Sequence, residues 1–166
     1  RIQTSVQTVR GVFFSHGYWV GGCFFSLNDI EQGILRANRG YPALPGGEFL
    51  RTDPRYALIM PTLDARLHFA LNCASESCPP IAFYLAENLE SQLTLATQNF
   101  INSHEVELDA QHHTAQLSKI FQWYAPDFGA SFAVTLGFGD ASPLLVWMSN
   151  YLLDAEWGKY VKLNVK

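Results

Sequence analysis

The sequence predicts an α+β fold: a single domain over residues 1–166, with a small antiparallel or mixed sheet packed against several helices. Three observations support this fold class. Segments with helical spacing of apolar residues are mixed with short strand-like segments, and their order shows no regular βαβ repetition. In addition, 48% of the 166 residues are hydrophobic, which is enough to bury a substantial core.

The composition argues against nucleic-acid binding, a membrane span and a disulfide framework. Eleven basic against fifteen acidic side chains leave a formal charge of −4, and no Lys/Arg cluster is present, so we expect no nucleic-acid partner. No run of eighteen apolar residues occurs, so we expect no membrane span. Three cysteines do not describe a disulfide framework, although one disulfide and a free thiol remain open.

The first half of the chain predicts a helix, a loop and a strand. Ser26 followed by Asp29 is typical of a capping box, and the apolar residues after it predict a helix over about 27–38. The Gly- and Pro-rich stretch 36–56 predicts a surface loop. In "ARLHFALNC" apolar and polar residues alternate, which predicts a strand with Leu67, Phe69 and Cys73 on one face and Arg66, His68 and Asn72 on the other.

The second half predicts helices around a hairpin. Pro80 is expected to open a short helix through "IAFY", and "LAENLESQLTLATQNFI" predicts a long amphipathic helix over 85–101. The stretches "VELD" at 106 and "TAQL" at 114 predict a hairpin. Ser142 followed by Pro143 marks the start of a buried helix through "LLVWMSNYLL".

Three stretches together resemble the bacterial and plant family called domain of unknown function 547. They are "GCFFSLNDIEQGILR" at 22–36, "DARLHFALNCASESCPPI" at 64–81 and "LSKIFQWYAPDFG" at 117–129. The chain departs from the family pattern at Gln32, where the family often has histidine, and at Ala65, where it often has proline. The family's upstream block is also missing, so we expect the chain to begin inside the domain.

The family is distantly similar to papain-like and transglutaminase-like folds, in which a cysteine ahead of a helix works with a histidine on a strand. This likeness implies a nucleophilic cysteine, and Cys78 is the candidate. It follows the polar "SES" and precedes Pro79 and Pro80, so it is expected to be extended just ahead of a positive helix end. Such a field lowers the pKa of a thiol and raises its thiolate fraction.

His68 is the candidate general base, ten residues before Cys78, and Glu31 is the candidate carboxylate that orients it. The order Glu31, His68, Cys78 reverses that of papain-like enzymes, so this assignment requires a permuted fold. The leading hypothesis is therefore a cysteine-dependent hydrolase or acyl transferase that acts on an amide or peptide bond and needs no cofactor. The candidate substrate-binding residues are Arg36, Arg66, Asn72, Trp123 and Tyr124.

Other interpretations stay open. Cys73 is better explained as a buried core thiol, and Cys78 also suits a structural cap or a disulfide. A non-catalytic module that binds a peptide or protein would use Glu31, Arg36, Asp64 and Arg66 as a structural ion-pair network. A redox sensor would use Cys78 as the thiol that is oxidised, and Cys73 or Cys23 would then form a disulfide with it. A metal site is the weakest interpretation, because His68, Cys73 and Cys78 supply at most three ligands.

Overall fold

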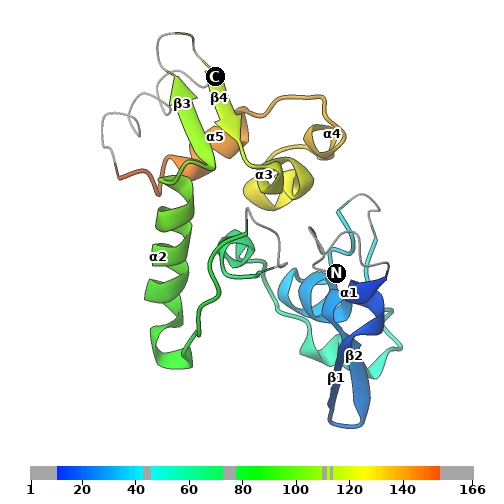
Figure 1. Cartoon of the computed structure of the whole chain (residues 1–166). Coiled ribbons are helices and arrows are strands. Elements are labelled where there is room, and N and C mark those ends of the chain that lie inside the picture. Colours follow the sequence, from blue (N-terminus) through cyan, green and yellow to red (C-terminus); the bar gives the residue numbers. More distant parts are fainter. Residues whose placement is uncertain (1–10, 43–45, 73–77, 110–111, 113, 154–166) are drawn as a thin grey trace, which may run out of the picture. The chain divides into compact units, whose positions relative to one another are not determined.

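The computed structural model describes residues 11–42, 46–72, 78–109, 112 and 114–153, and it confirms the α+β class (Figure 1). The chain divides into two compact units. Unit 1 comprises residues 1–64 and 73–76, and unit 2 comprises residues 65–72 and 77–166. Each unit contains one two-stranded antiparallel hairpin, in place of the single sheet that the sequence predicts.

Unit 1 is built from a hairpin and short helices. Its elements are α1 (Val12–Ser15), β1 (Gly17–Val20), β2 (Cys23–Ser26), the π-helix η2 (Asp29–Leu35) and the 3-10 helix η3 (Pro54–Leu58). Strands β1 and β2 pair with Gly17 opposite Ser26 and Val20 opposite Cys23. The turn between them uses Gly21 and Gly22, both with positive φ, which glycine adopts without steric cost.

The capping box at the start of η2 is confirmed. The amide of Ser26 donates to Asp29 Oδ2 at 2.8 Å, and the amide of Asp29 donates to Ser26 Oγ at 3.0 Å. Gly33 then admits the ring of Phe49, because a Cβ at Gly33 would lie 2.4 Å from a ring carbon of Phe49. The ring of Phe49 is 2% exposed, so η2 and the following loop share a buried contact.

Arg55 joins three parts of unit 1. Its guanidinium donates to the carbonyl of Phe24 at 3.0 Å and pairs with Asp29 at 3.1 Å and Asp53 at 2.8 Å. It also lies 4.5 Å from the ring centroid of Phe49, within the range of a cation–π contact. Arg55 therefore ties β2, η2 and η3 together.

Unit 2 is mainly helical. Its elements are the 3-10 helices η4 (Ala65–Phe69), η5 (Ala86–Asn88) and η6 (Ala125–Phe128), the helices α2 (Leu89–Ile101), α3 (Lys119–Trp123), α4 (Phe132–Thr135) and α5 (Ser142–Met148), and the strands β3 (Val106–Asp109) and β4 (Thr114–Leu117). The hairpin β3–β4 and the start of α5 lie where the sequence predicts them. The long helix begins at Leu89 in place of Leu85.

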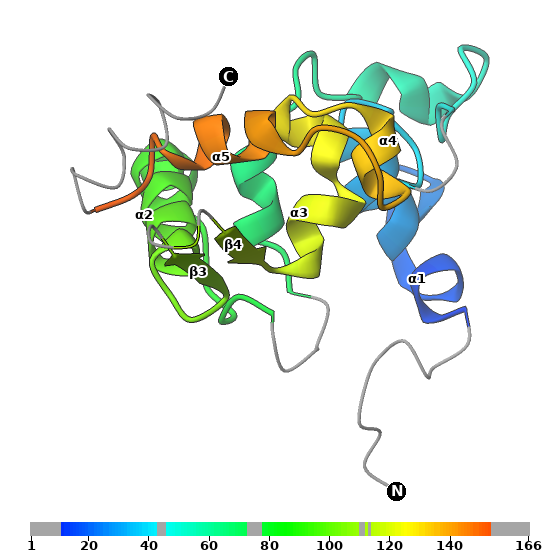
Figure 2. The same ribbon diagram turned by 90° about the horizontal axis from the view of Figure 1, so that it is seen from above.

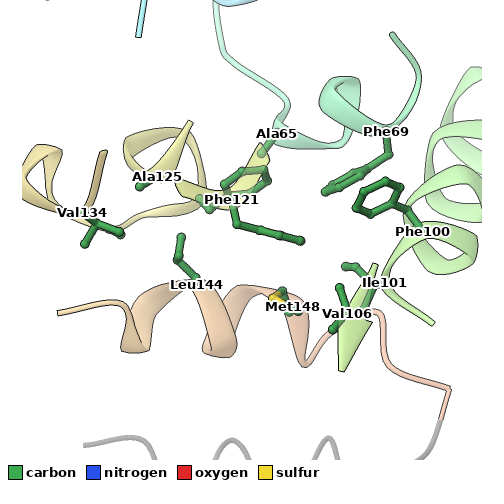
Figure 3. Packing of buried hydrophobic residues seen from close by; sticks show 12 residues of the cluster. Ala65, Phe69, Phe100, Ile101, Val106, Phe121, Ala125, Val134, Leu144 and Met148 are labelled. Atoms are coloured by element: carbon green, nitrogen blue, oxygen red, sulfur yellow. The ribbon is translucent and has the colours of Figure 1, made fainter. Parts of the chain in front are cut away.

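A cluster of buried aromatic and aliphatic side chains forms the core of unit 2. Figure 3 shows Phe69 from η4 and Phe100 from α2 next to Phe121 from α3, with Leu144 and Met148 rising from α5. The ring centroids of Phe69 and Phe100 are 4.9 Å apart, and those of Phe69 and Phe121 are 5.7 Å apart. Figure 2 shows η4 beside α2, and this packing places η4 in the core.

The strand predicted over 65–73 is wrong for residues 65–72, the part that the structure describes. Residues 65–69 form η4, and Leu67, His68 and Phe69 are all buried, which an alternating strand does not allow. The prediction placed His68 on a polar face, opposite Leu67 and Phe69. A hydrogen bond within unit 2 satisfies His68 instead, so three successive residues of a helix are buried.

The predicted helix after Pro80 is also wrong. Residues 79–85 have no regular secondary structure. Side chains form hydrogen bonds with some of the backbone groups that a helix would pair internally. Asn72 Nδ2 donates to the carbonyl of Pro79, while Gln92 Nε2 donates to the carbonyl of Phe83 at 3.0 Å. Gln92 Oε1 accepts from the amide of Leu85 at 2.8 Å. We call residues 79–85 the edge segment.

Candidate functional site

His68 and Asp127 form a buried pair in unit 2. Nε2 of His68, on η4, lies 2.8 Å from Oδ2 of Asp127, on η6. The two side chains are 2% and 0% exposed. A hydrogen bond of this kind fixes the orientation of the imidazole ring and the position of its proton.

Aromatic rings enclose this pair. The ring of Tyr124 stacks on His68 with centroids 4.0 Å apart, and the ring of Phe128 lies 5.5 Å from it. Tyr124, a predicted substrate-binding residue, is therefore packed on the imidazole of His68. Trp123 differs from its neighbour, since it is 43% exposed.

Asp127 is the residue that sequence analysis missed. The carboxylate expected to orient His68 was Glu31, which lies in unit 1, while His68 lies in unit 2. The role of Glu31 stays a prediction, but the carboxylate bonded to Nε2 is that of Asp127. One signal was available: a single acidic residue inside the apolar stretch "WYAPDF" needs a polar partner if the stretch is buried.

Cys78 is disulfide-bonded, whereas Cys23 is a free thiol. A sulfur in a disulfide is not a nucleophilic thiolate until it is reduced. No helix follows Cys78 either, so the helix field that was expected to lower the pKa of its thiol is absent from residues 79–85. Cys73, predicted to be a core thiol, lies outside the described residues.

The charged and amide candidates have local partners. In unit 1, Arg36 is 3% exposed and donates to the side chain of Gln32 and to the carbonyl of Gly40. In unit 2, Arg66 pairs with Glu90 at 2.7 Å and donates to Thr94 at 2.9 Å, which anchors η4 on α2. Asn72 donates to the carbonyl of Pro79, so it positions the start of the edge segment.

The edge segment exposes large apolar side chains, and Pro80 and Ala82 are exposed as well. Ile81 is 81% exposed, Phe83 is 90% exposed and Leu85 is 51% exposed, whereas Tyr84 is half-buried. Burial raises the pKa of the Tyr84 phenol. Within the described part of the chain, Ile81, Ala82 and Tyr84 make no backbone hydrogen bond. The segment therefore combines an exposed apolar stripe with unpaired backbone groups.

Residues 11–42, 46–72, 78–109, 112 and 114–153 form neither a cluster of metal-ligating side chains nor a membrane-spanning helix. These residues contain no group of three or more His, Cys, Asp and Glu side chains placed to hold a metal ion. They contain no helix that is long and apolar enough to cross a membrane.

A family model described as "Protein of unknown function, DUF547" matches residues 3–101. The chain belongs to the DUF547 family. The match to DUF547 covers η4 and the edge segment, and it ends before the stretch 117–129 that contains Asp127. No curated protein and no solved structure matches this DUF547 chain, so the likeness to papain-like and transglutaminase-like folds is not supported.

Proposed function

We propose that this DUF547 chain is a non-catalytic module that binds a peptide or a protein along the edge segment. The observation that supports the proposal is the exposure of Ile81 and Phe83 on a chain segment that has no regular secondary structure. Exposed apolar side chains that are contiguous, rather than scattered, are typical of interaction sites. Burying a side chain of this size contributes about 1.5–3 kcal/mol.

The edge segment is also held in its conformation before any ligand arrives. Asn72 holds its first carbonyl, and the side-chain amide of Gln92 bonds both Phe83 and Leu85. A segment that is ordered in advance loses less conformational entropy on binding, so more of the contact energy appears as affinity. Gln92 therefore acts as a positioning residue.

Panning of a phage-displayed library of random short peptides tests this proposal. We expect enriched peptides that bind the parent protein and lose at least tenfold in affinity for Phe83→Ser, because Phe83 makes no core contact but supplies the contact area. Phe138→Ser is the matched control, since Phe138 is 63% exposed elsewhere in unit 2. Peptides whose affinity falls equally in both variants, or no enrichment at all, would contradict the proposal.

A second candidate function is that of a cysteine-dependent hydrolase or acyl transferase, with Cys78 as nucleophile, His68 as base and Asp127 as the group that orients His68. The observation that favours it is the hydrogen bond between His68 and Asp127, since a carboxylate-bonded imidazole is the base half of a catalytic triad. This function requires reduction of the Cys78 disulfide before the thiolate can attack a carbonyl carbon.

A panel of fluorogenic peptide amides, assayed with and without a thiol reductant, tests the second candidate. We expect hydrolysis only in the reduced protein, and its loss in Cys78→Ala. Cys23→Ala is the control, because Cys23 is a free thiol and lies in unit 1. Activity that survives in Cys78→Ala rules the cysteine mechanism out.

A further inference from the structure

We infer that the hairpin of unit 1 inserts its tip into the interfacial region of a lipid bilayer. We call Tyr18, Trp19 and Val20, at the end of β1, together with the turn residues Gly21 and Gly22 the hairpin tip. The inference goes beyond the proposed peptide binding and does not depend on it, because the edge segment lies in unit 2. Interfacial binding also needs no helix that crosses the membrane.

Apolar side chains are exposed on both faces of the hairpin tip. Successive residues of a strand point to opposite faces, so Tyr18 and Val20 share one face and Trp19 lies on the other. These side chains are 64%, 59% and 75% exposed, respectively. A protein that docks on a two-stranded ribbon covers one face, whereas a bilayer interface surrounds an inserted tip on all sides. Exposure on both faces therefore favours a lipid surface.

Charged side chains are absent from this part of the chain. Residues 11–28 contain no Asp, Glu, Lys or Arg, although 16% of all residues are charged. A charged side chain is costly to bury in lipid, whereas Trp and Tyr are enriched at the boundary between headgroups and hydrocarbon. The whole chain has a formal charge of −4, which does not attract it to anionic lipids. We therefore assign the tip to a zwitterionic lipid surface.

The apolar area of the tip fits insertion better than dimerisation. At about 150–250 Å² per aromatic side chain, the exposed parts of Tyr18 and Trp19 amount to roughly 200–350 Å². A stable protein interface buries about 800 Å² on each partner. The tip is too small to hold a second copy of this chain by itself, whereas a few apolar side chains at a bilayer surface give reversible binding.

The base of the hairpin is fixed in unit 1 before any lipid binds. Phe25, opposite Tyr18, is 4% exposed, and the carbonyl of Phe24 accepts a hydrogen bond from Arg55 at 3.0 Å. The ring centroid of Trp19 lies 5.7 Å from that of Phe24, so the indole rests on the hairpin. Figure 1 shows the turn at the end of the hairpin away from α1. A tip that is ordered in advance loses little conformational entropy on insertion.

Sedimentation with sucrose-loaded phosphatidylcholine vesicles tests the inference. We expect the parent protein to sediment with the vesicles and Val20→Asp to lose about tenfold or more in its partition coefficient, because the new carboxylate would have to enter the interface. Leu136→Asp is the matched control, since Leu136 is 54% exposed in unit 2 and both variants add the same charge. We expect Leu136→Asp to stay within about twofold of the parent.

Quenching of fluorescence by brominated phosphatidylcholine identifies the side chain that inserts. The chain has four tryptophans, and bromine quenches only those that lie close to the lipid chains. We expect vesicles to quench the parent and Trp123→Phe, and to quench Trp19→Phe much less. Trp123 is the matched control, because it is 43% exposed but lies in unit 2.

Several results would overturn the inference. They are a parent protein that does not sediment with vesicles, an equal loss in Val20→Asp and Leu136→Asp, and quenching that survives in Trp19→Phe. Binding that appears only when phosphatidylserine is added would show attraction by charge in place of insertion. A parent dimer that Val20→Asp dissociates would show that a second copy covers the tip. None of these results bears on the proposed peptide binding, which depends on Phe83 in unit 2.

Discussion

Nε2 of His68 and Oδ2 of Asp127 lie 2.8 Å apart, with both side chains almost completely buried. A second His–Asp pair in unit 2 has similar geometry in a different environment. Nδ1 of His112 lies 2.6 Å from Oδ2 of Asp109, and these side chains are 73% and 47% exposed. The two pairs differ mainly in solvent access, which decides how much each contributes to stability.

Removing His68 should destabilise the protein strongly. His68→Ala removes the imidazole that is bonded to the buried carboxyl group of Asp127 and opens a cavity beside Tyr124, so we expect the free energy of unfolding to fall by about 3 kcal/mol or more. Urea denaturation measures this change. His112→Ala is the matched control, with an expected loss below about 1 kcal/mol. Similar losses in both variants would contradict the structural role of the buried pair.

Filling the space at Gly33 should destabilise unit 1. A Cβ at this position would lie 2.4 Å from a ring carbon of Phe49, so Gly33→Ala forces the ring or the helix to move. We expect a loss of about 1–3 kcal/mol in the free energy of unfolding, as in other overpacked cores. Gly33→Ala should cost less stability when it is made in the Phe49→Leu variant than when it is made in the parent protein, because the smaller side chain leaves space for the added methyl group. An equal loss in the parent and in the Phe49→Leu variant would show that the ring of Phe49 does not limit the space at Gly33.

Asp53 should make stability depend on pH in the acid range. Hydrogen bonds from Arg55 hold the pKa of Asp53 below its ordinary value of 3.8. The contribution of this pair is therefore fully present above pH 3.8 and is lost as the pH falls below 3.8 through the folded-state pKa. Asp53→Asn removes the charge while an amide oxygen can still cap η3.

Urea denaturation from neutral pH to about pH 2 tests this dependence. We expect the parent to be more stable than Asp53→Asn above pH 3.8, and the difference to shrink below it. A difference that stays constant down to the lowest pH would show that the charge of Asp53 does not contribute.

The cysteines should react differently with an alkylating reagent. Cys23 is a free thiol, whereas Cys78 is disulfide-bonded. We expect iodoacetamide to label Cys23 and not Cys78 without reductant, and to label Cys78 after reduction, because alkylation requires a thiolate. Mass spectrometry of the digested protein measures both. Labelling of Cys78 before reduction would contradict the disulfide and strengthen the cysteine-dependent mechanism.

Features that depend on near neighbours in the sequence were predicted well. The capping box of Ser26 and Asp29, the hairpin of β3 and β4, and the helix that starts at Ser142 all follow from residues a few positions apart. The start of α2 was misplaced by four residues, since Gln92 bonds the amide of Leu85 outside any helix and residues 86–88 form the 3-10 helix η5. The local pattern was right, and a side-chain hydrogen bond set the boundary.

Only the tertiary structure decided the surroundings of His68 and the shape of the edge segment. His68 and Asp127 are 59 positions apart, and no local pattern joins them. The sequence by itself determined the α+β class, the family and the positions of η2, α2, α5 and the β3–β4 hairpin, because backbone propensity and capping act over a few residues. Burial of His68 depends on Asp127, which is distant along the chain, and only the folded chain brings the two together. The course of residues 79–85 depends on side-chain bonds from Asn72 and Gln92, which no backbone propensity predicts.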